Sequence, residues 1–198
     1  MRLETAGYSN RAGRAINCDA LLWREREFGL VAALCSAGSE KTAAVSAARL
    51  ASLRLIELAE EVFCADDARE ALRGVIKEAG ADGFVGSVFD AALLTVRGGT
   101  AVWAGAGSAV LAVFADGEIR RFGETPDITA AETEISPGCA LLAGSDGLWR
   151  QVSETECMID LCKSQDAAQW LDYLLLRHLE RSQLGGDSVS ALLCIADE

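Results

Sequence analysis

The sequence is poor in several residue types, and each scarcity narrows the range of possible functions. Among 198 residues there are two prolines, one histidine, and 18 lysines and arginines against 30 aspartates and glutamates. The resulting net charge is −12. Proteins that bind nucleic acids or anionic membrane surfaces concentrate basic residues, so this composition argues against both kinds of partner.

Long hydrophobic runs and paired cysteines are also lacking. No apolar stretch is long enough to span a bilayer, and the N-terminus has no apolar signal-peptide core. The seven cysteines include no Cys-x-x-Cys pair, and several lie in apolar runs, which favours reduced, buried thiols over disulfides. We therefore expect a cytoplasmic protein. Because 51% of the residues are hydrophobic and no linker is evident, we expect a single domain over residues 1–198.

The first third of the chain has the pattern strand, strand, helix, helix. Short apolar runs at 20–23 and 28–33 predict a hairpin, and an alanine- and leucine-rich stretch over 39–62 predicts a long helix. A second helix is expected from Asp67, because Asp67 and Glu70 resemble a capping box and Gly80 is a natural stop.

The rest of the chain adds strands and then two more helices. Asp116-Gly117 is a strong hairpin signal, Pro126 lies in an expected loop, and Ser153 with Glu156 forms a second capping box. Strands are predicted at 87–96, 100–104, 109–114, 119–122, 140–143 and 189–195, and a helix at 165–181. This order predicts an α+β fold, a four-layer αββα sandwich of two antiparallel sheets flanked by helix pairs.

Three aspartates lie where strands are predicted to begin or end. Asp146 follows the strand at 140–143, Asp187 precedes the last strand, and Asp19 begins the strand at 20–23, shortly after Arg14. Converging at one rim, these carboxylates suit Mg²⁺ or Mn²⁺, and an arginine suits a phosphate oxygen. Taken singly, an aspartate–glycine pair is more often a turn and Arg14 more often a solvated loop residue.

Six segments resemble, in order, the motifs of the metal-dependent protein phosphatases, the type 2C serine/threonine phosphatase family. They are residues 14–19, 28–38, 86–88, 106–108, 145–148 and 186–188. Two of the matches are fairly specific. The segment 14–19 reads Arg-Ala-Ile-Asn-Cys-Asp against the family's Arg-x-x-Asn-Glu-Asp, and 145–148 reads Ser-Asp-Gly-Leu, as in the family.

The resemblance implies a function for each matched position. In that family two metal ions at one end of a β-sandwich activate a water that attacks a phosphoserine or phosphothreonine. Carried over residue by residue, Asp146 and Asp187 would be metal ligands, Asp19 a water-mediated ligand, and Arg14 the residue that holds phosphate.

The departures from the family pattern concern the metal site. The bridging aspartate falls on Ala33 and the next glycine on Leu34, while two further carboxylates fall on Cys18 and Gly107. Two dications held close together repel strongly, and a shared carboxylate offsets much of that repulsion. We therefore expect at most one Mg or Mn ion, held by Asp146 and Asp187.

Two other catalytic patterns carry less weight. Cys18 and Arg24 have the Cys-x5-Arg spacing of cysteine-dependent phosphatases, but the residues between them form a strand-like run rather than a glycine-rich anion cradle. The only histidine, His178, is expected at the surface or at a helix end rather than as a base.

Three functions remain open at this point. The first is a pseudophosphatase that binds a phosphoprotein or a partner from a protein kinase pathway and hydrolyses phosphate poorly or not at all. The second is an active Mg²⁺- or Mn²⁺-dependent phosphatase with a reduced site, and the third is a structural interaction domain without phosphate binding. The presence of Arg14 favours the first two, and the losses at Ala33, Cys18 and Gly107 weigh against the second.

Overall fold

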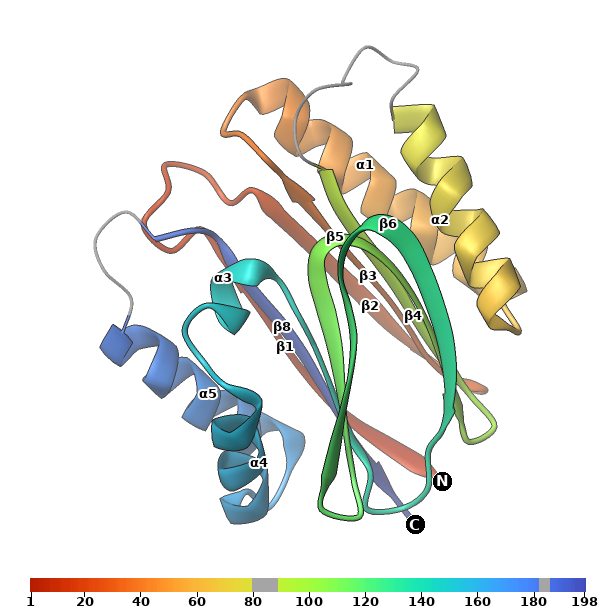
Figure 1. Cartoon of the computed structure of the whole chain (residues 1–198), viewed down its shortest axis with the longest axis vertical. Coiled ribbons are helices and arrows are strands. Elements are labelled where there is room, and N and C mark those ends of the chain that lie inside the picture. The colour runs from red at the N-terminus through yellow and green to blue at the C-terminus, as the bar shows by residue number, and fades with distance from the viewer. Residues whose placement is uncertain (80–88, 182–185) are drawn as a thin grey trace.

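The computed structural model describes residues 1–79, 89–181 and 186–198. In these parts of the chain, eight strands and five α-helices form the mixed α+β fold expected from the sequence (Figure 1). The strands are β1 Arg2–Asn10, β2 Asp19–Arg26, β3 Gly29–Ala37, β4 Phe89–Arg97, β5 Thr100–Ala115, β6 Glu118–Glu134, β7 Ala140–Gly144 and β8 Val189–Asp197. The helices are α1 Thr42–Leu58, α2 Ala65–Ala79, α3 Asp146–Trp149, α4 Glu154–Lys163 and α5 Ala167–Arg181.

All eight strands belong to one antiparallel sheet, in the order β1-β8-β7-β5-β4-β3-β2, with β6 paired to β5. The two separate sheets predicted from the sequence are thus joined, because β5 runs on through both. Its first half pairs with β4 from Thr100 to Ala106, and its second half pairs with β7 from Val110 to Phe114. The two strands expected at 100–104 and 109–114 are therefore one.

One further prediction about the strands differs from the structure, and one strand was not predicted at all. Pro126 was expected in a loop but lies within β6, where the register against β5 shifts between Gly105 and Val110. Proline tolerates such a place because irregular pairing leaves a backbone position without a required N–H donor. Strand β1 had no clear sequence signal, and it pairs with β8 along its whole length.

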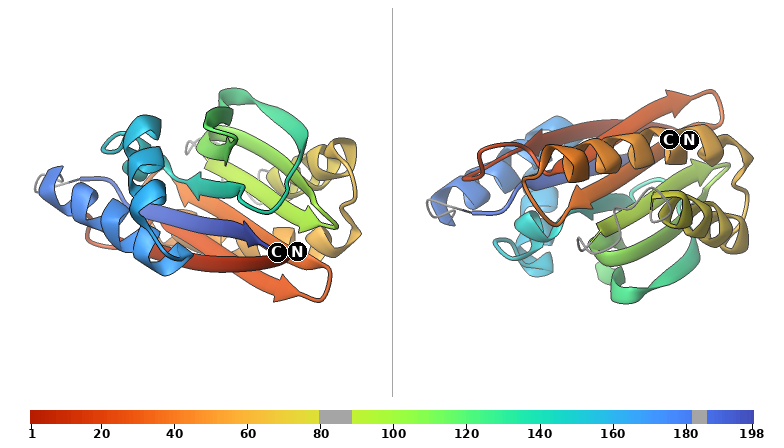
Figure 2. Two further views of the ribbon diagram at one scale, coloured as in Figure 1. Left: turned by 90° about the horizontal axis from the view of Figure 1, so that it is seen from below. Right: turned by 90° about the horizontal axis from the view of Figure 1, so that it is seen from above.

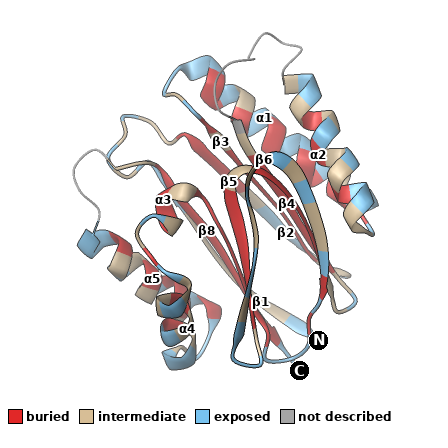
Figure 3. Ribbon diagram, in the orientation of Figure 1, coloured by how far each residue is buried: buried red, intermediate tan, exposed pale blue. Residues whose placement is uncertain are grey.

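Buried apolar residues form three clusters. One packs α1 and α2 against β3, β4 and β5, and another packs α4 and α5 against β7 and β8. The third consists mainly of strand residues from both halves of the sheet, including Leu34, Trp103 and Leu192, and it contains no helix residue. Figures 2 and 3 show the helix pairs on opposite sides of the strands, with buried residues along the strands between them.

One of the two predicted helix capping boxes is present in the structure. Ser153 and Glu156 form the predicted capping box of α4. The capping box predicted at Asp67 does not mark the start of its helix, because α2 begins two residues earlier, at Ala65. The Asp67 carboxylate instead accepts hydrogen bonds from the backbone N–H groups of Phe63 and Cys64. His178 lies in the last turn of α5, as expected of a helix-end residue, but it is buried.

The chain ends lie side by side, since Arg2 of β1 pairs with Asp197 of β8 (Figure 1). None of the helices in the described residues is long and apolar enough to cross a membrane. The predicted stop at Gly80 and the motif at 86–88 fall outside the described residues.

Candidate functional site

A cavity of about 450 Å³ lies where β2 begins, β3 ends and β4 begins. It contains all four residues selected from the sequence, Arg14, Asp19, Asp146 and Asp187. The chain therefore brings together at one end of the sheet residues that are up to 173 positions apart. The other lining residues are Cys18, Ser36, Ala37, Gly38, Asp90, Gly107, Ser108, Glu124, Thr125, Pro126, Arg150 and Ser188.

One wall of the cavity is a row of residues across three strands. Asp19 of β2 pairs with Ser36 of β3, which pairs in turn with Asp90 of β4. Residues directly opposite one another in an antiparallel sheet point to the same face, so these three side chains line the cavity together. The Ser36 hydroxyl donates a hydrogen bond of 2.7 Å to Asp19 Oδ1.

Asp19 is the most enclosed carboxylate of this wall, with 4% of the residue exposed. Its second oxygen, Oδ2, is buried and has no hydrogen-bond partner among the described residues. Burial raises the pKa of Asp19, and the nearby hydroxyls of Ser36, Ser145 and Ser190 act in the opposite direction. Burying a polar oxygen without a hydrogen-bond partner costs folding free energy. Asp19 Oδ2 is therefore the oxygen in the cavity that would gain most from a bound cation or proton.

Asp146 reaches the cavity from the first turn of the short helix α3, with Ser145 at the position before the helix. The sequence suggested a turn at Asp146-Gly147, and the structure shows a helix start instead. Gly147 is required for another reason: a side chain there would collide with the backbone carbonyl of Ser188. Burial raises the pKa of Asp146, Arg150 lowers it, and the neighbouring Asp187 raises it further.

Two arginines bind the carboxylates that were predicted to hold metal. Arg14 forms an ion pair with Asp187 Oδ1, and Arg150 forms one with Asp187 Oδ2. Arg150 also contacts Asp146, with 2.8 Å between Nη2 and Oδ2. The four side chains thus form a continuous network, Arg14–Asp187–Arg150–Asp146.

Several polar residues of the cavity were not selected as site residues from the sequence, among them Arg150, Asp90 and Ser36. Arg150 is four positions after Asp146, a spacing that brings side chains together only once the segment is known to be helical. Asp90 is a charged residue in an apolar strand run, which is itself a signal of a special position. Ser36 lies within the matched segment 28–38, but no function was assigned to it.

Two of the family positions are clarified by the structure. Ala33, aligned with the bridging aspartate, lies in the cluster that α1 and α2 cover, whereas Ser36 three residues later lines the cavity. The strand-end position next to Asp19 therefore carries a hydroxyl rather than a carboxylate. Gly107 has φ +83°, and the Asp90 carboxylate fills the space that a side chain at 107 would need. Asp90 accepts a hydrogen bond from Ser108 there.

Some of the donors in the cavity suit a hard cation. Carboxylate oxygens suit Mg²⁺ or Mn²⁺, and Asp19 Oδ2 is without a partner. Within the described residues, however, no group of three or more histidine, cysteine, aspartate or glutamate side chains is arranged to hold a metal ion. Asp146 and Asp187 already have guanidinium partners, and Ser36 supplies no shared negative charge. A binuclear centre does not fit this arrangement.

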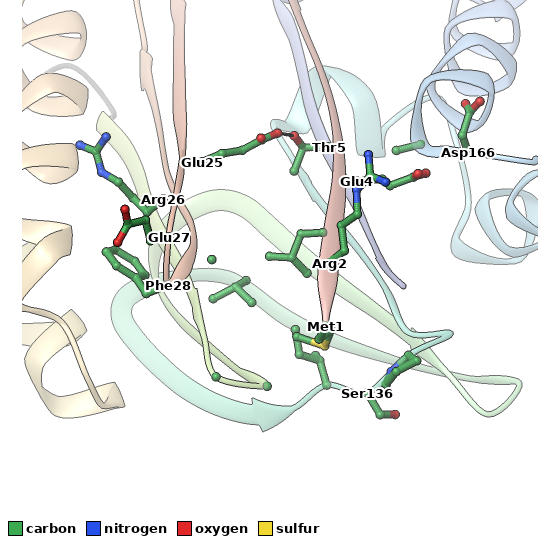
Figure 4. Close-up of a pocket in the computed structure, with 18 of the residues that line it drawn as sticks. Met1, Arg2, Glu4, Thr5, Glu25, Arg26, Glu27, Phe28, Ser136 and Asp166 are labelled. Carbon is green, nitrogen blue, oxygen red and sulfur yellow. Dashed lines mark hydrogen bonds between the residues drawn. The ribbon is translucent and has the colours of Figure 1, made fainter. Parts of the chain in front are cut away.

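A larger cavity, of about 1190 Å³, lies at the opposite end of the strands (Figure 4). It is formed by the start of β1, the β2–β3 hairpin and the start of α5. Its charged side chains include Arg2 and Glu4 of β1, Glu25, Arg26 and Glu27 of the β2–β3 hairpin, and Asp166 just before α5, all labelled in Figure 4. The grouped carboxylates and arginines are in the smaller cavity, which is the better candidate for chemistry.

Several solved structures are similar to this one over nearly the whole chain. The Mycobacterium tuberculosis serine/threonine phosphatase PstP/Ppp is 18% identical with a TM-score of 0.80, covering 99% of each chain, and its catalytic domain has also been solved in complex with two manganese ions. PppA, described as a key regulatory component of T6SS in Pseudomonas aeruginosa, is 20% identical with a TM-score of 0.75, covering 99% of this chain and 98% of that one. The S. agalactiae serine/threonine phosphatase is 14% identical with a TM-score of 0.81, covering 99% and 100%.

No protein-family model matches the chain, and no curated protein matches it by sequence. At identities of 14% to 20% the structural likeness establishes the fold and leaves the activity open. The resemblance found in the motifs is therefore confirmed at the level of the architecture: this chain has the fold of the metal-dependent serine/threonine phosphatases.

Proposed function

We propose that this protein is a phosphatase-like domain with lost or strongly impaired hydrolysis that binds a phosphorylated protein from a kinase pathway. The observation that carries the proposal is the arginine–carboxylate network. Asp146 and Asp187, the expected metal ligands, are bound by Arg150 and Arg14. Such a cavity keeps its shape and its arginine N–H donors for a phosphate group. Its carboxylates are already paired with guanidinium groups, so they are not available to two metal ions.

Arg14 is the residue best placed to contact a phosphate group. Its guanidinium is partly buried at the cavity, where it bonds Asp187, and a guanidinium has five N–H donors, so donors remain for a ligand. The lining includes five carboxylates and two arginines, which would repel an anion. The positive charges of Arg14 and Arg150 offset part of that repulsion.

A second candidate is an active phosphatase that uses a single Mg²⁺ or Mn²⁺ ion. The buried, unpartnered oxygen of Asp19 favours it, together with the proximity of Asp146 and Asp187. These three aspartates would hold the ion, which would supply positive charge for a phosphate ester. Arg150 would first have to leave both Asp146 and Asp187.

The remaining expectations belong to the same proposal. The four-layer αββα arrangement is supported by three separate apolar clusters, with no helix residue in the middle one. A single domain is supported by the continuous sheet that joins β1 to β2. We place the protein in the cytoplasm on the strength of its seven cysteines, all free in the structure.

Phosphopeptide binding tests the proposal directly. A fluorescein-labelled phosphothreonine peptide and its unphosphorylated form are titrated with wild type, Arg14→Ala and Arg120→Ala, the last an exposed arginine of β6 outside the cavity. We expect phosphate-dependent binding that weakens about tenfold or more in Arg14→Ala only, since a charge-assisted contact contributes about 1.5–3 kcal/mol. Equal binding of both peptides, unaffected by Arg14→Ala, would favour a structural interaction domain.

Turnover separates the two phosphatase-like candidates. Hydrolysis of para-nitrophenyl phosphate and of the phosphopeptide is followed with added Mn²⁺ or Mg²⁺ for wild type and Asp146→Ala. We expect no metal-dependent turnover above the level of Asp146→Ala. Metal-dependent hydrolysis that disappears in Asp146→Ala would replace the proposal by the active-enzyme candidate.

A further inference from the structure

One guanidinium in the cavity contacts both of the carboxylates that a cation would need. Nη2 of Arg150 lies 2.8 Å from Asp146 Oδ2, and Nη1 pairs with Asp187 Oδ2. These two oxygens belong to segments 41 positions apart, the start of α3 and the loop before β8. Arg150 follows α3 directly and reaches both because its planar fork presents parallel donors.

The two carboxylates need a positive charge between them. Like charges at close range repel each other, and Arg150 lies against an oxygen of each of these two carboxylates. An arginine carries one permanent charge, whatever the metal content of the solution. A divalent ion that coordinated the same two oxygens would compete with the guanidinium, because both oxygens already contact Arg150 and two cations at such short range repel each other.

We propose that Arg150 is an internal counter-ion that takes the place of a divalent cation, so that the cavity is assembled without metal and a cation binds only when Arg150 moves out. This inference rests on the proposed function in that both explain a carboxylate cavity without a paired metal centre. It adds a named competitor for the metal, a role that the motifs do not assign to this position.

The same contact can open, because Arg150 is held loosely. Its side chain is 62% exposed, whereas those of Asp146 and Asp187 are 23% and 30% exposed. Long exposed arginines exchange freely between a salt bridge and solvent, and such bridges are weak. Asp187 keeps a second cation in any case, since the less exposed Arg14 binds its other oxygen. Opening therefore frees mainly Asp146 and one oxygen of Asp187.

Manganese binding tests the proposal without reference to activity. The free Mn²⁺ signal in electron paramagnetic resonance is titrated with wild type, Arg150→Met and the matched control Arg120→Met, which removes the same charge from an exposed site on β6 outside the cavity. We expect Arg150→Met to bind one Mn²⁺ at least about tenfold more tightly than wild type, because a positive charge next to the ion is removed. The control should stay within about twofold of wild type, since distant exposed charges are screened.

Two additional variants locate the effect. The double variant Asp146→Asn with Arg150→Met should lose the gained affinity, because the freed carboxylate is gone. Arg150→Lys keeps the charge but has no fork to span both carboxylates, so we expect an intermediate affinity. Circular dichroism checks that each variant is folded, and if Arg150→Met does not fold, Arg150→Lys decides.

Three results would overturn the inference: no gain in Arg150→Met or Arg150→Lys, an equal gain in Arg120→Met, or a gain that survives Asp146→Asn. Each is independent of the proposed function, which fails on metal-dependent turnover or on phosphate-independent peptide binding. A wild type that hydrolyses phosphopeptide can still show the Arg150 effect, and an inactive wild type can lack it.

Discussion

Two networks of arginines and carboxylates contain the same kinds of ion pair but differ in their balance of charge. One joins α4 to α5, where Arg177 bonds Asp160 and Glu156, and Arg181 also bonds Glu156. It has as many arginines as carboxylates. The other lies in the cavity, where Arg14 and Arg150 share the site with five carboxylates.

The pKa shifts follow this difference in charge balance. Hydrogen bonds from Arg181 and Ser153 hold the pKa of Glu156 well below its usual range, whereas burial and neighbouring carboxylates raise the pKa of Asp146. Between the helices every charge has a partner, so that network serves stability. In the cavity negative charge is left over, which costs stability and is typical of a site that binds something.

The comparison predicts its largest effect at Arg177. The side chain of Asp160 is 4% exposed and receives two bonds from the Arg177 guanidinium, so Arg177→Met leaves a buried, unpaired carboxylate. We expect the free energy of unfolding to fall by about 3 kcal/mol, measured by urea denaturation. The double variant Arg177→Met with Asp160→Leu should recover much of the loss. A fall below about 1 kcal/mol in the single variant would contradict a structural role for this network.

A change of opposite sign is expected at Asp19. Asp19→Asn removes a buried charge whose Oδ2 has no hydrogen-bond partner among the described residues. At neutral pH the variant should be more stable than wild type by about 1–2 kcal/mol. The exposed Asp127→Asn on β6 is the control and should change stability by less than about 0.5 kcal/mol. A destabilised Asp19→Asn protein would show that the carboxylate is satisfied after all.

The two networks should also respond oppositely to pH. The raised pKa of Asp19 gives stability that is complete below the unfolded carboxyl value near pH 4 and is lost as pH rises through the folded value. The lowered pKa of Glu156 gives stability that is present above about pH 4 and is lost as pH falls. Melting temperatures are therefore measured from acid to neutral pH. In Asp19→Asn, the loss of stability that wild type shows as pH rises should disappear. In Glu156→Gln, the loss of stability that wild type shows as pH falls should become smaller. Unchanged profiles in both variants would refute these assignments.

The smallest stability effect is expected at Arg150, although its proposed role in metal binding is the larger one. Its side chain is 62% exposed, so screening by solvent reduces its ion pairs to about 0.5 kcal/mol of stability. Arg150→Met should thus leave the free energy of unfolding almost unchanged in physiological salt, and the difference should vanish at 1 M NaCl. A loss comparable to that in Arg177→Met would mean that both networks are structural.

Much of the fold was predictable because it depends on local signals. The hairpin at Asp116-Gly117, the capping box at Ser153 and the alternating apolar runs all act within a few residues. What failed needed information from distant partners. Strand β1 forms only because β8, at the other end of the chain, offers it an edge, and Pro126 is tolerated only where β6 pairs irregularly with β5.

The site likewise has residues that the sequence predicted and residues that only the folded structure reveals. Arg14, Asp19, Asp146 and Asp187 were found from motifs, and all four line one cavity. Their partners could not be found, because contacts such as the one from Arg150 to Asp187 span segments that only the folded sheet brings together. Ala33, the position aligned with the family's bridging aspartate, does not line the cavity, whereas Ser36 does. The sequence could not show this, because a buried strand with few polar residues gives no sign of its register until Ser36 is seen opposite Asp19.

Strand β5 connects the two halves of the sheet. It is hydrogen-bonded to β4, which α1 and α2 cover, and then to β7, which α4 and α5 cover. The irregular stretch between its two halves includes Gly107 and Ser108, which touch Asp90. Asp90 of the cavity wall therefore lies against the point where β5 changes partners. The shape of the cavity depends on the backbone geometry of this irregular stretch of β5.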